Sequence, residues 1–260
     1  MKAVILAGGL GTRLSEETHL KPKPMIEIGN KPILWHIMKI YSYYNINDFV
    51  ICLGYKGQLI VEYFLNYKYL NSDITISLFN DNIEVHRQNN ENWKITLVNT
   101  GLNTSTGGRI LKVKEYLKNE EDFFLTYGDG VANVNLKELL KFHKKNNKIA
   151  TLTAAIPLPR FGSVIMNKKG EVKSFSEKNK SNENYINGGF FVLKPSIFNY
   201  IKSGVETIWE KAPLENLAKD DQLAAFKHKG FWQPMDTLRD KNYLEELWSK
   251  NKAPWKIWND

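Results

Sequence analysis

Cysteine is almost absent from this sequence: Cys52 is the only one among 260 residues, and it lies in the apolar run 49–53. A single thiol cannot build an intrachain disulfide framework or a cysteine-based zinc site, so both are excluded. Chains that do without disulfides are typical of reducing compartments. We therefore expect a cytoplasmic protein.

Long hydrophobic runs are missing as well. The longest ones, such as 4–7 and 190–193, are far shorter than the roughly 20 residues that a membrane-spanning helix needs. The amino terminus reads MKAVILAGG, which is typical of a first strand and not of a signal peptide. We expect no membrane partner. Disorder is excluded for the chain as a whole, because 42% of its residues are hydrophobic and can build a core.

Acidic residues are fewer than basic ones, with 28 Asp and Glu against 36 Lys and Arg and a net charge of +8. The excess favours anionic partners without saying which. A nucleic-acid-binding pattern is lacking, because the cations are spread along the chain in pairs such as Lys144 and Lys145, with no basic tail and no aromatic RNA-binding motif. We expect no nucleic-acid partner, and most of these lysines are typical of a solvated surface.

The order of the segments indicates an α/β fold. Short β-type runs alternate with helical patterns over the first 150 residues, and Pro32 marks the start of the first helix. The expected strands are 2–7, 48–53, 122–127 and 150–155, and the expected helices are 33–44, 58–67, 108–117 and 136–145. Such alternation implies βαβ crossovers. We predict a Rossmann-like, mixed, mainly parallel sheet flanked by helices.

Two regions depart from the alternation. Residues 74–98 contain ITISLF, IEVHR and WKITLV, three β-type runs that we expect to form a small antiparallel insertion. Residues 161–193 also predict successive strands. After Asp236 the pattern is helical to about Lys250 and then aromatic. We therefore predict a core over residues 1–236, with the β insertion at about 74–98, and a helical C-terminal tail over 237–260.

The most informative motif is the glycine-rich segment LAGGLGTRL over 6–14, directly after the first strand. Glycines there leave N–H groups open to a phosphate, and open α/β sheets bind ligands at this edge. The motif is not a Walker loop, since no Gly-Lys-Ser/Thr follows, and it lacks the third small residue of the dinucleotide fingerprint. A purely structural turn is the alternative. Several cations nearby, Arg13 and Lys23 among them, favour a polyphosphate ligand, and Pro22 and Pro24 stiffen the chain around Lys23.

Arg109 and the histidines are less informative. Arg109 follows Thr-Gly-Gly where a helix is expected to begin, and a helix amino terminus attracts anions; a surface arginine is the alternative. The five histidines show no metal-ligand spacing, and we expect His36 to be packed within its helix. The tryptophans near the carboxyl terminus are typical of a core or of subunit contacts.

Motifs along nearly the whole chain resemble the sugar-1-phosphate nucleotidyltransferases, and among them the bacterial branch that makes CDP-glucose. The first motif is common to all of these enzymes, whereas FWQPMDTLRDK and the stretch from WKITLVNTG to TGGRI resemble the cytidylyltransferase branch. The matching segments are LAGGLGTRL (6–14), KPKPMIEIGNKPILWHI (21–37), GYKG (54–57), TGGRI (106–110), FLTYGDGVA (124–132), FGSV (161–164), INGGFFVL (186–193), FWQPMDTLRDK (231–241) and KAPWKIW (252–258).

The resemblance implies the residues of a site. Arg13 and Lys23 are the expected catalytic residues, and Asp129 and Asp236 the expected ligands of Mg²⁺, which takes one or two carboxylates together with phosphate oxygens. As alternatives, an aspartate caps a turn, or the carboxylates pair with the cations nearby. The substrate contacts that the resemblance implies are Leu6, Ala7, Gly8, Gly9, Leu10, Gly11, Thr12, Arg13, Lys23, Thr104, Arg109, Gly128, Glu177, Lys178 and Asn187.

The implied reaction joins CTP and α-D-glucose 1-phosphate to give CDP-glucose and pyrophosphate. UTP or dTTP as the nucleotide, and a catalytically silent nucleotide-sugar-binding protein, are the alternatives. The resemblance also implies a closed homo-oligomer, described for the family as a hexamer. We expect the insertion and the tryptophan-rich tail to form its contacts.

Overall fold

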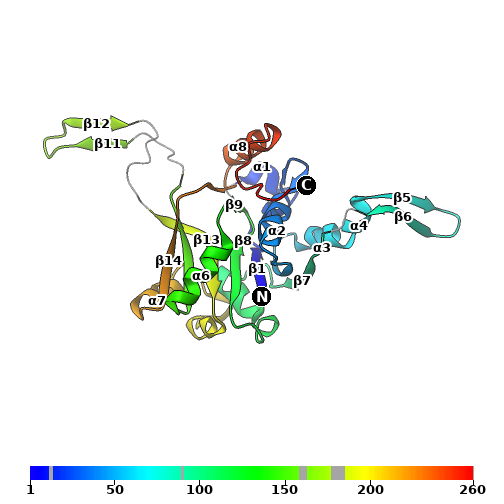
Figure 1. The fold of residues 1–260 in the computed structure, drawn as a ribbon, viewed down its shortest axis with the longest axis horizontal. Helices are drawn as coiled ribbons and strands as arrows, with labels where there is room; N and C mark the ends of the chain where they lie inside the picture. The colour runs from blue at the N-terminus through cyan, green and yellow to red at the C-terminus, as the bar shows by residue number, and fades with distance from the viewer. Residues whose placement is uncertain (12–13, 89–90, 158–162, 177–184, 260) are drawn as a thin grey trace.

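A seven-stranded sheet forms the centre of the computed structural model, which describes residues 1–11, 14–88, 91–157, 163–176 and 185–259 (Figure 1). The strand order is β14-β10-β13-β8-β1-β4-β7. These strands are β1 (Lys2–Ala7), β4 (Asp48–Leu53), β7 (Lys94–Asn99), β8 (Phe123–Tyr127), β10 (Ala150–Ala155), β13 (Ile186–Leu193) and β14 (Leu223–His228). Strand β13 runs antiparallel to both of its neighbours, and the other pairings are parallel. The expected mixed, mainly parallel sheet is confirmed.

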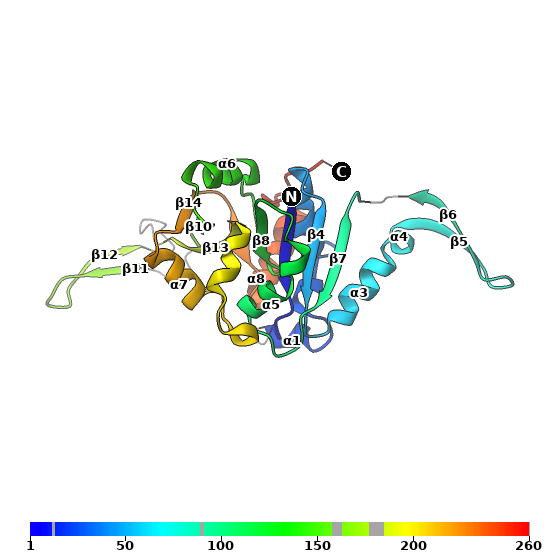
Figure 2. The ribbon, with the colours of Figure 1, turned by 90° about the horizontal axis from the view of Figure 1, so that it is seen from below.

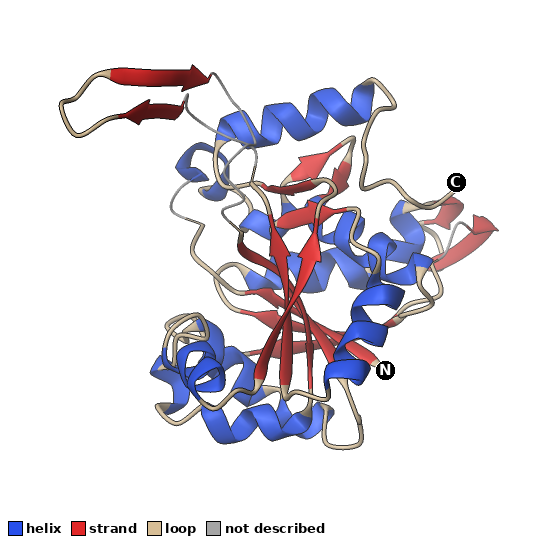
Figure 3. Ribbon diagram, turned by 60° about the vertical axis from the view of Figure 1, so that its left-hand side comes forward, coloured by secondary structure: helices blue, strands red, loops and turns tan. Residues whose placement is uncertain are grey.

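Helices cover both faces of this sheet (Figure 3). Alternate residues of β1 separate into two cores, with Ile5 in one and Val4 in the other, as the two-residue period of a strand requires. Helices α2, α6 and α8 pack into the first core, and α5, α7 and η4 into the second. The helices are α1 (Ser15–Thr18), α2 (Ile33–Tyr43), α3 (Gly57–Leu65), α4 (Tyr67–Leu70), α5 (Thr106–Lys112), α6 (Leu136–Asn146), α7 (Ala212–Lys219) and α8 (Leu238–Ser249), with short 3₁₀ turns η2 (Lys23–Met25), η3 (Lys114–Tyr116), η4 (Pro195–Tyr200) and η5 (Gly204–Glu206).

The predicted three-stranded insertion is wrong in its third strand. The runs ITISLF and IEVHR form the antiparallel hairpin β5 (Ser72–Ser77) and β6 (Asn82–Gln88), which projects from the end of α4 (Figure 2). The third run, β7, pairs in parallel with β4 as the last strand of the central sheet. Alternation of apolar residues predicts a strand but does not identify its pairing partner, which here is distant in the sequence.

Shorter strand pairs complete the fold. Residues 163–176 form the hairpin β11 (Ser163–Met166) and β12 (Val172–Ser176), as expected for that region, whereas β13 belongs to the central sheet. Two further pairs join β2 (Glu27–Ile28) with β3 (Lys31–Pro32), and β9 (Gly130–Ala132) with β15 (Trp232–Pro234). In the described part of the chain, no helix is both long and apolar enough to cross a membrane.

The carboxyl-terminal segment packs onto α2. Helix α8 ends at Ser249, one residue before the expected end, and the aromatic residues after it fold back onto the core. Trp255 is fully buried and Trp258 nearly so. The sequence predicts either a core position or a subunit contact for the tryptophans of this segment. The structure places Trp255 and Trp258 in the core.

Candidate functional site

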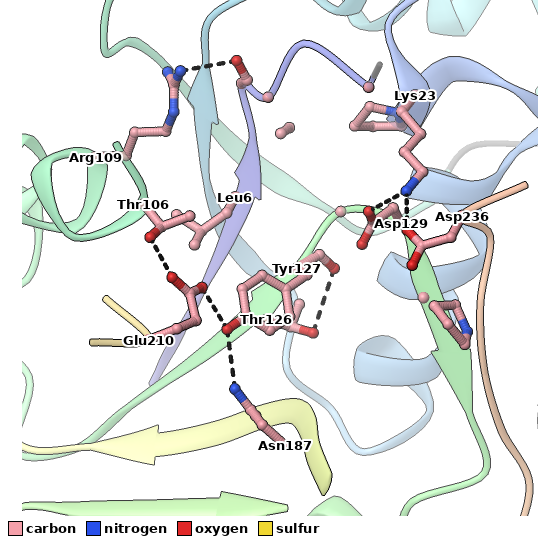
Figure 4. Close-up of a pocket in the computed structure, with 18 of the residues that line it drawn as sticks. Leu6, Lys23, Thr106, Arg109, Thr126, Tyr127, Asp129, Asn187, Glu210 and Asp236 are labelled. Atoms are coloured by element: carbon pink, nitrogen blue, oxygen red, sulfur yellow. Dashed lines mark hydrogen bonds and ion pairs between the residues drawn. The ribbon is translucent and has the colours of Figure 1, made fainter. Parts of the chain in front are cut away.

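A cavity of about 700 Å³ lies at the carboxyl ends of β1 and β8 (Figure 4). This is the edge at which open α/β sheets bind ligands. Four segments that are far apart in the sequence meet there: the glycine-rich loop, the start of α5, the turn after β8 and the chain after β15. The lining includes Leu6, Ala7, Gly8, Gly9, Gly11, Lys23, Thr104, Thr106, Arg109, Tyr127, Gly128, Asp129, Asn187, Glu210 and Asp236.

Two glycines, Gly8 in the glycine-rich loop and Gly128 in the turn after β8, allow close contacts around the cavity. A Cβ at Gly8 would lie 2.2 Å from Nη1 of Arg109, so no larger residue fits without moving the guanidinium. Gly128 donates its N–H to the carbonyl oxygen of Leu6 at 3.0 Å, and a Cβ there would lie 2.9 Å from the same oxygen. The loop is therefore closely fitted to its neighbours, and Gly9, with open space beside it, faces the cavity.

Arg109 is 4% exposed, and its guanidinium ties three loops together. Nη2 donates to the carbonyl of Gly8 at 2.8 Å and to that of Leu102 at 3.2 Å. Nη1 donates to the carbonyls of Leu53 and Gly101 and, at 2.6 Å, to Oγ1 of Thr100. Burial lowers the pKa of this guanidinium from its ordinary value. The surface-arginine alternative is therefore wrong.

Helix α5 begins at Thr106, two residues earlier than expected, so Arg109 lies within the helix and not at its amino terminus. Thr104 is also buried, and its hydroxyl donates to the carbonyl of Thr100 at 2.6 Å. Both side chains line the cavity while they hold its backbone. Their contact with a substrate stays a prediction.

Lys23, Asp129 and Asp236 come together at the other end of the cavity (Figure 4). Nζ of Lys23 lies 2.8 Å from Oδ2 of Asp129 and 2.6 Å from Oδ1 of Asp236. Pro22 directly precedes the short helix η2, which begins at Lys23, and Pro24 occupies its second position. The two prolines thus fix the backbone of a lysine whose side chain is almost completely buried.

The two aspartates flank a pair of short strands, which explains how distant residues meet. Asp129 directly precedes β9, Asp236 follows β15, and Gly130 is paired with Pro234. The N–H of Met235 donates to the carbonyl of Asp129 at 2.8 Å. On the other side, the carboxylate of Asp240 accepts from the N–H of Asp236 at 3.1 Å. Both backbones are therefore fixed before any ligand binds.

The carboxylate pair suits a divalent cation that brings further ligands. Both carboxylates already share one cation, the ammonium group of Lys23. No group of three or more His, Cys, Asp or Glu side chains that could hold a metal occurs among the residues that the structure describes. A metal at Asp129 and Asp236 would therefore take its remaining ligands from substrate oxygens and water, which is how Mg²⁺ is usually bound.

A second polar cluster contains residues that the sequence does not single out. The carboxylate of Glu210 accepts from the hydroxyl of Tyr127 and from that of Thr106, each at 2.7 Å. The side-chain amide of Asn187 donates to the hydroxyl of Tyr127 at 3.2 Å. Tyr127 directly precedes Gly128 and Asp129, so its motif points to the site, but no local pattern marks Glu210.

Four predicted site residues lie outside the described residues, namely Thr12, Arg13, Glu177 and Lys178. Leu10 and Gly11 are described, and Gly11 adopts a left-handed conformation with φ of 67° that suits glycine. His36 is buried, as expected, with Nε2 2.8 Å from the carbonyl oxygen of Ile28.

Comparisons with known proteins agree with this arrangement. The family model "Nucleotidyl transferase" matches residues 2–253. The chain is 58% identical to glucose-1-phosphate cytidylyltransferase of Salmonella typhimurium, over 99% of this chain and 100% of that protein. It is 46% identical to a probable glucose-1-phosphate cytidylyltransferase of Bacillus subtilis, with the same coverage. Among solved structures, HddC from Yersinia pseudotuberculosis matches with a TM-score of 0.69 at 23% identity, covering 95% of this chain and 99% of HddC, which supports the fold.

Proposed function

The chain belongs to the nucleotidyl transferase family, and from that premise we propose that it transfers the cytidylyl group of CTP to α-D-glucose 1-phosphate. The products are CDP-glucose and pyrophosphate. The observation that carries this proposal is the match to glucose-1-phosphate cytidylyltransferase, which extends over that enzyme's whole length at 58% identity. The cavity at the carboxyl edge of the sheet supports the proposal, because it brings Lys23, Asp129 and Asp236 together.

The glycine-rich loop and the loop before α5 form the proposed nucleoside end. Cytosine carries a 4-amino group that donates hydrogen bonds, whereas uracil and thymine carry an oxygen that only accepts them. Backbone carbonyls near Gly9 or in 101–106 accept from cytosine and are left unpaired by uracil, which penalises the wrong base. Arg109 fixes the carbonyls of Gly8 and Gly101 and so supports this part of the cavity.

Lys23 and the carboxylate pair form the proposed phosphate end, and we place Mg²⁺ on Asp129 and Asp236. A bound Mg²⁺ would neutralise charge on the phosphates and on the leaving pyrophosphate. In the structure, the ammonium group of Lys23 pairs with both carboxylates and offsets one of their two charges. When another cation takes over that task, the lysine is released to bind a phosphate oxygen. Arg13 is the second proposed phosphate ligand.

The transfer itself needs no covalent enzyme intermediate. An oxygen of the glucose 1-phosphate group forms a bond to the α-phosphorus of CTP, the bond from that phosphorus to the bridging oxygen breaks, and pyrophosphate leaves with its electron pair. The protein contributes positioning and charge stabilisation. Asn187 is the proposed contact to a glucose hydroxyl, and Glu177 and Lys178 are the proposed contacts to the sugar and its phosphate.

We also propose that the protein assembles into a closed homo-oligomer through the β5–β6 hairpin; by family resemblance we expect a hexamer. Leu78 and Phe79 at the turn of this hairpin are 89% and 99% exposed, and Ile76 and Ile83 on its strands are exposed as well. Apolar groups held this far into solvent are typical of interaction sites. Because Trp255 and Trp258 of the tail are buried within the subunit, we propose the hairpin, and not these tryptophans, as the contact between subunits. The cytoplasm stays the expected compartment.

A nucleotide panel tests the proposed function. Pyrophosphate release is measured with glucose 1-phosphate and each of CTP, UTP, dTTP, GTP and ATP. We expect turnover with CTP at a kcat/KM that exceeds each of the others by several orders of magnitude. Equal use of UTP or dTTP would contradict the choice of base. Binding of CDP-glucose without turnover of any nucleotide would instead identify a nucleotide-sugar-binding protein.

A further inference from the structure

Glu210 places a carboxylate in the cavity, and none of its partners among the described residues is a cation. The side chain is exposed and lines the cavity on the side opposite Lys23 (Figure 4). Among the residues that the structure describes, its partners are two hydroxyl groups, those of Tyr127 and Thr106, and no ion pair involves it. Among the described residues that line the cavity, the one buried lysine, Lys23, is already bound to Asp129 and Asp236.

The hydroxyl partners fix the orientation of this carboxylate. Oγ1 of Thr106 accepts a hydrogen bond from the backbone N–H of Trp209 at 2.9 Å, and its own O–H therefore points toward Oε2 of Glu210. Tyr127 accepts from the amide of Asn187 and turns its O–H toward Oε1. The carboxylate is thus held by two donors from two different elements.

The negative charge of Glu210 restricts which part of a bound substrate lies beside it. A carboxylate accepts hydrogen bonds, and each of its oxygens retains acceptor capacity after one bond. It repels phosphate oxygens, which the lysine at the other end of the cavity attracts. The part of the ligand beside Glu210 is therefore uncharged and carries donors. Sugar hydroxyls meet this description, and the proposed substrates offer them on the ribose of CTP and on the glucose ring.

We propose that Glu210 determines specificity by accepting a hydrogen bond from a sugar hydroxyl of the substrate, on the ribose or on the hexose. The inference rests on the proposed function and adds a residue to that site. Asn187 and Glu210, linked through the phenol of Tyr127, then offer one donor and one acceptor on the same wall of the cavity. A ring with neighbouring hydroxyls can use both.

The test compares substrates with analogues that lack one hydroxyl. For the ribose, 2′-deoxy-CTP and 3′-deoxy-CTP replace CTP; for the hexose, the 2-, 3-, 4- and 6-deoxy analogues replace glucose 1-phosphate. Each is measured as kcat/KM with the wild type, Glu210→Gln and the control Glu206→Gln, an exposed residue of η5 that does not line the cavity. A hydrogen bond to a charged group corresponds to roughly 10- to 100-fold in kcat/KM.

We expect one analogue to lose about that factor with the wild type and with Glu206→Gln, and the parent-to-analogue ratio to fall to within about threefold of one in Glu210→Gln. The affected analogue tells ribose from hexose. Equal ratios in the wild type and Glu210→Gln for every analogue would overturn the inference. The inference would also be overturned if the wild type used every analogue as well as the parent substrate. This result depends on the wild type alone and does not require that the variant folds.

Two further results keep this test separate from the proposed function. If circular dichroism shows that Glu210→Gln does not fold, Glu210→Asp retains the charge but withdraws the carboxylate by one methylene, and the same loss of discrimination is expected. If the wild type uses a nucleotide other than CTP, the proposed function is wrong, but the ratios are measured with that nucleotide and its deoxy forms and still decide the role of Glu210.

Discussion

At the scale of single residues, the carboxylates beside Lys23 lead to the first prediction. Asp129→Asn keeps the size of the side chain and should leave the fold intact. It removes one charge from the proposed Mg²⁺ site, and we expect kcat/KM to fall by about 10²–10³, or about 2–4 kcal/mol. Because the defect lies in affinity for the ion, excess Mg²⁺ should restore part of the activity. The measurement is kcat/KM as a function of Mg²⁺ concentration.

The control for this experiment is Asp221→Asn, which removes an exposed carboxylate that pairs with Lys148 on the surface. Its left-handed backbone, with φ of 52°, suits asparagine. We expect its Mg²⁺ requirement to equal that of the wild type. If Asp129→Asn and Asp236→Asn also kept the wild-type requirement and activity, these carboxylates would have a structural role in pairing with Lys23 and the proposed metal site would be misplaced.

His36 gives a prediction about pH. Its Nε2 carries the proton, because its partner, the carbonyl of Ile28, only accepts. Its Nδ1 lies 3.4 Å from the indole N–H of Trp255, which only donates, so Nδ1 cannot also carry a proton without opposing that donor. Burial lowers the pKa of His36 to about 4, below the roughly 6.5 of an unfolded histidine.

A depressed folded-state pKa means that protonation favours the unfolded chain. The contribution of the neutral imidazole to the free energy of unfolding is complete above about pH 6.5 and is lost as the pH falls to about 4, on the order of 3 kcal/mol. Urea unfolding at pH 7, 5.5 and 4 measures it. We expect His36→Gln, which retains a donor toward Ile28, to be less stable at pH 7 and to lose less stability on acidification. Parallel curves for both proteins would argue against this role.

At the scale of elements, the start of helix α8 connects stability to the site. Thr237 and Asp240 form a capping box, in which Oγ1 of Thr237 accepts from the N–H of Asp240 and the carboxylate of Asp240 accepts from the N–H of Thr237. The same carboxylate accepts from the N–H of Asp236. The cap of α8 and the backbone of a proposed metal ligand therefore depend on one side chain.

Thr237→Ala should lower the free energy of unfolding by about 1 kcal/mol, the usual cost of losing an amino-terminal cap. We also expect the Mg²⁺ concentration for half-maximal activity to rise, because Asp236 loses part of its support, while kcat at saturating Mg²⁺ is retained. Thr237→Ser keeps the hydroxyl and serves as the control for urea unfolding and for Mg²⁺ titration. A rise in the Mg²⁺ requirement for both variants would rule out the cap as its cause.

The sequence predicts best those helices and strands that have a local pattern of apolar residues. Strands β1 and β4 match the expected bounds, because continuous apolar runs bounded by polar residues identify buried strands. The partner of β7 was not predictable, since register and pairing depend on contacts across the sheet. For the site, the proximity of Lys23, Asp129 and Asp236 was expected only from the resemblance of their motifs to a known family, because their spacing in the sequence does not predict it. Glu210 follows no motif, and only the packing of its loop against α5 brings it to the cavity.

At the scale of the whole molecule, the hairpin β5–β6 leads to a prediction about assembly. The double change Leu78→Ser and Phe79→Ser removes the two most exposed apolar side chains of the turn. If they are buried between subunits, each contributes roughly 1.5–3 kcal/mol, so the variant should dissociate. Light scattering should give the wild type a multiple of 30.1 kDa and shift the variant toward 30.1 kDa.

The control is Met166→Ser, which removes an exposed apolar residue from the other projecting hairpin. We expect it to keep the wild-type mass, and far-ultraviolet circular dichroism should be the same for all three proteins. A wild type that scatters as a 30.1 kDa particle at micromolar concentration would exclude the proposed oligomer.

The pairing of Lys23 with Asp236 spans 213 residues of the chain, which matters while the protein is being made. At 5–20 residues per second, a ribosome adds the second partner roughly 10–40 s after the first. During that interval the nascent chain contains Lys23 and later Asp129. It still lacks Asp236, helix α8 and the tryptophans that pack against α2. The cavity is therefore among the last parts of the molecule to form, and a ribosome that stalls before residue 236 releases a chain in which the cavity is incomplete and the apolar face of α2 is partly uncovered.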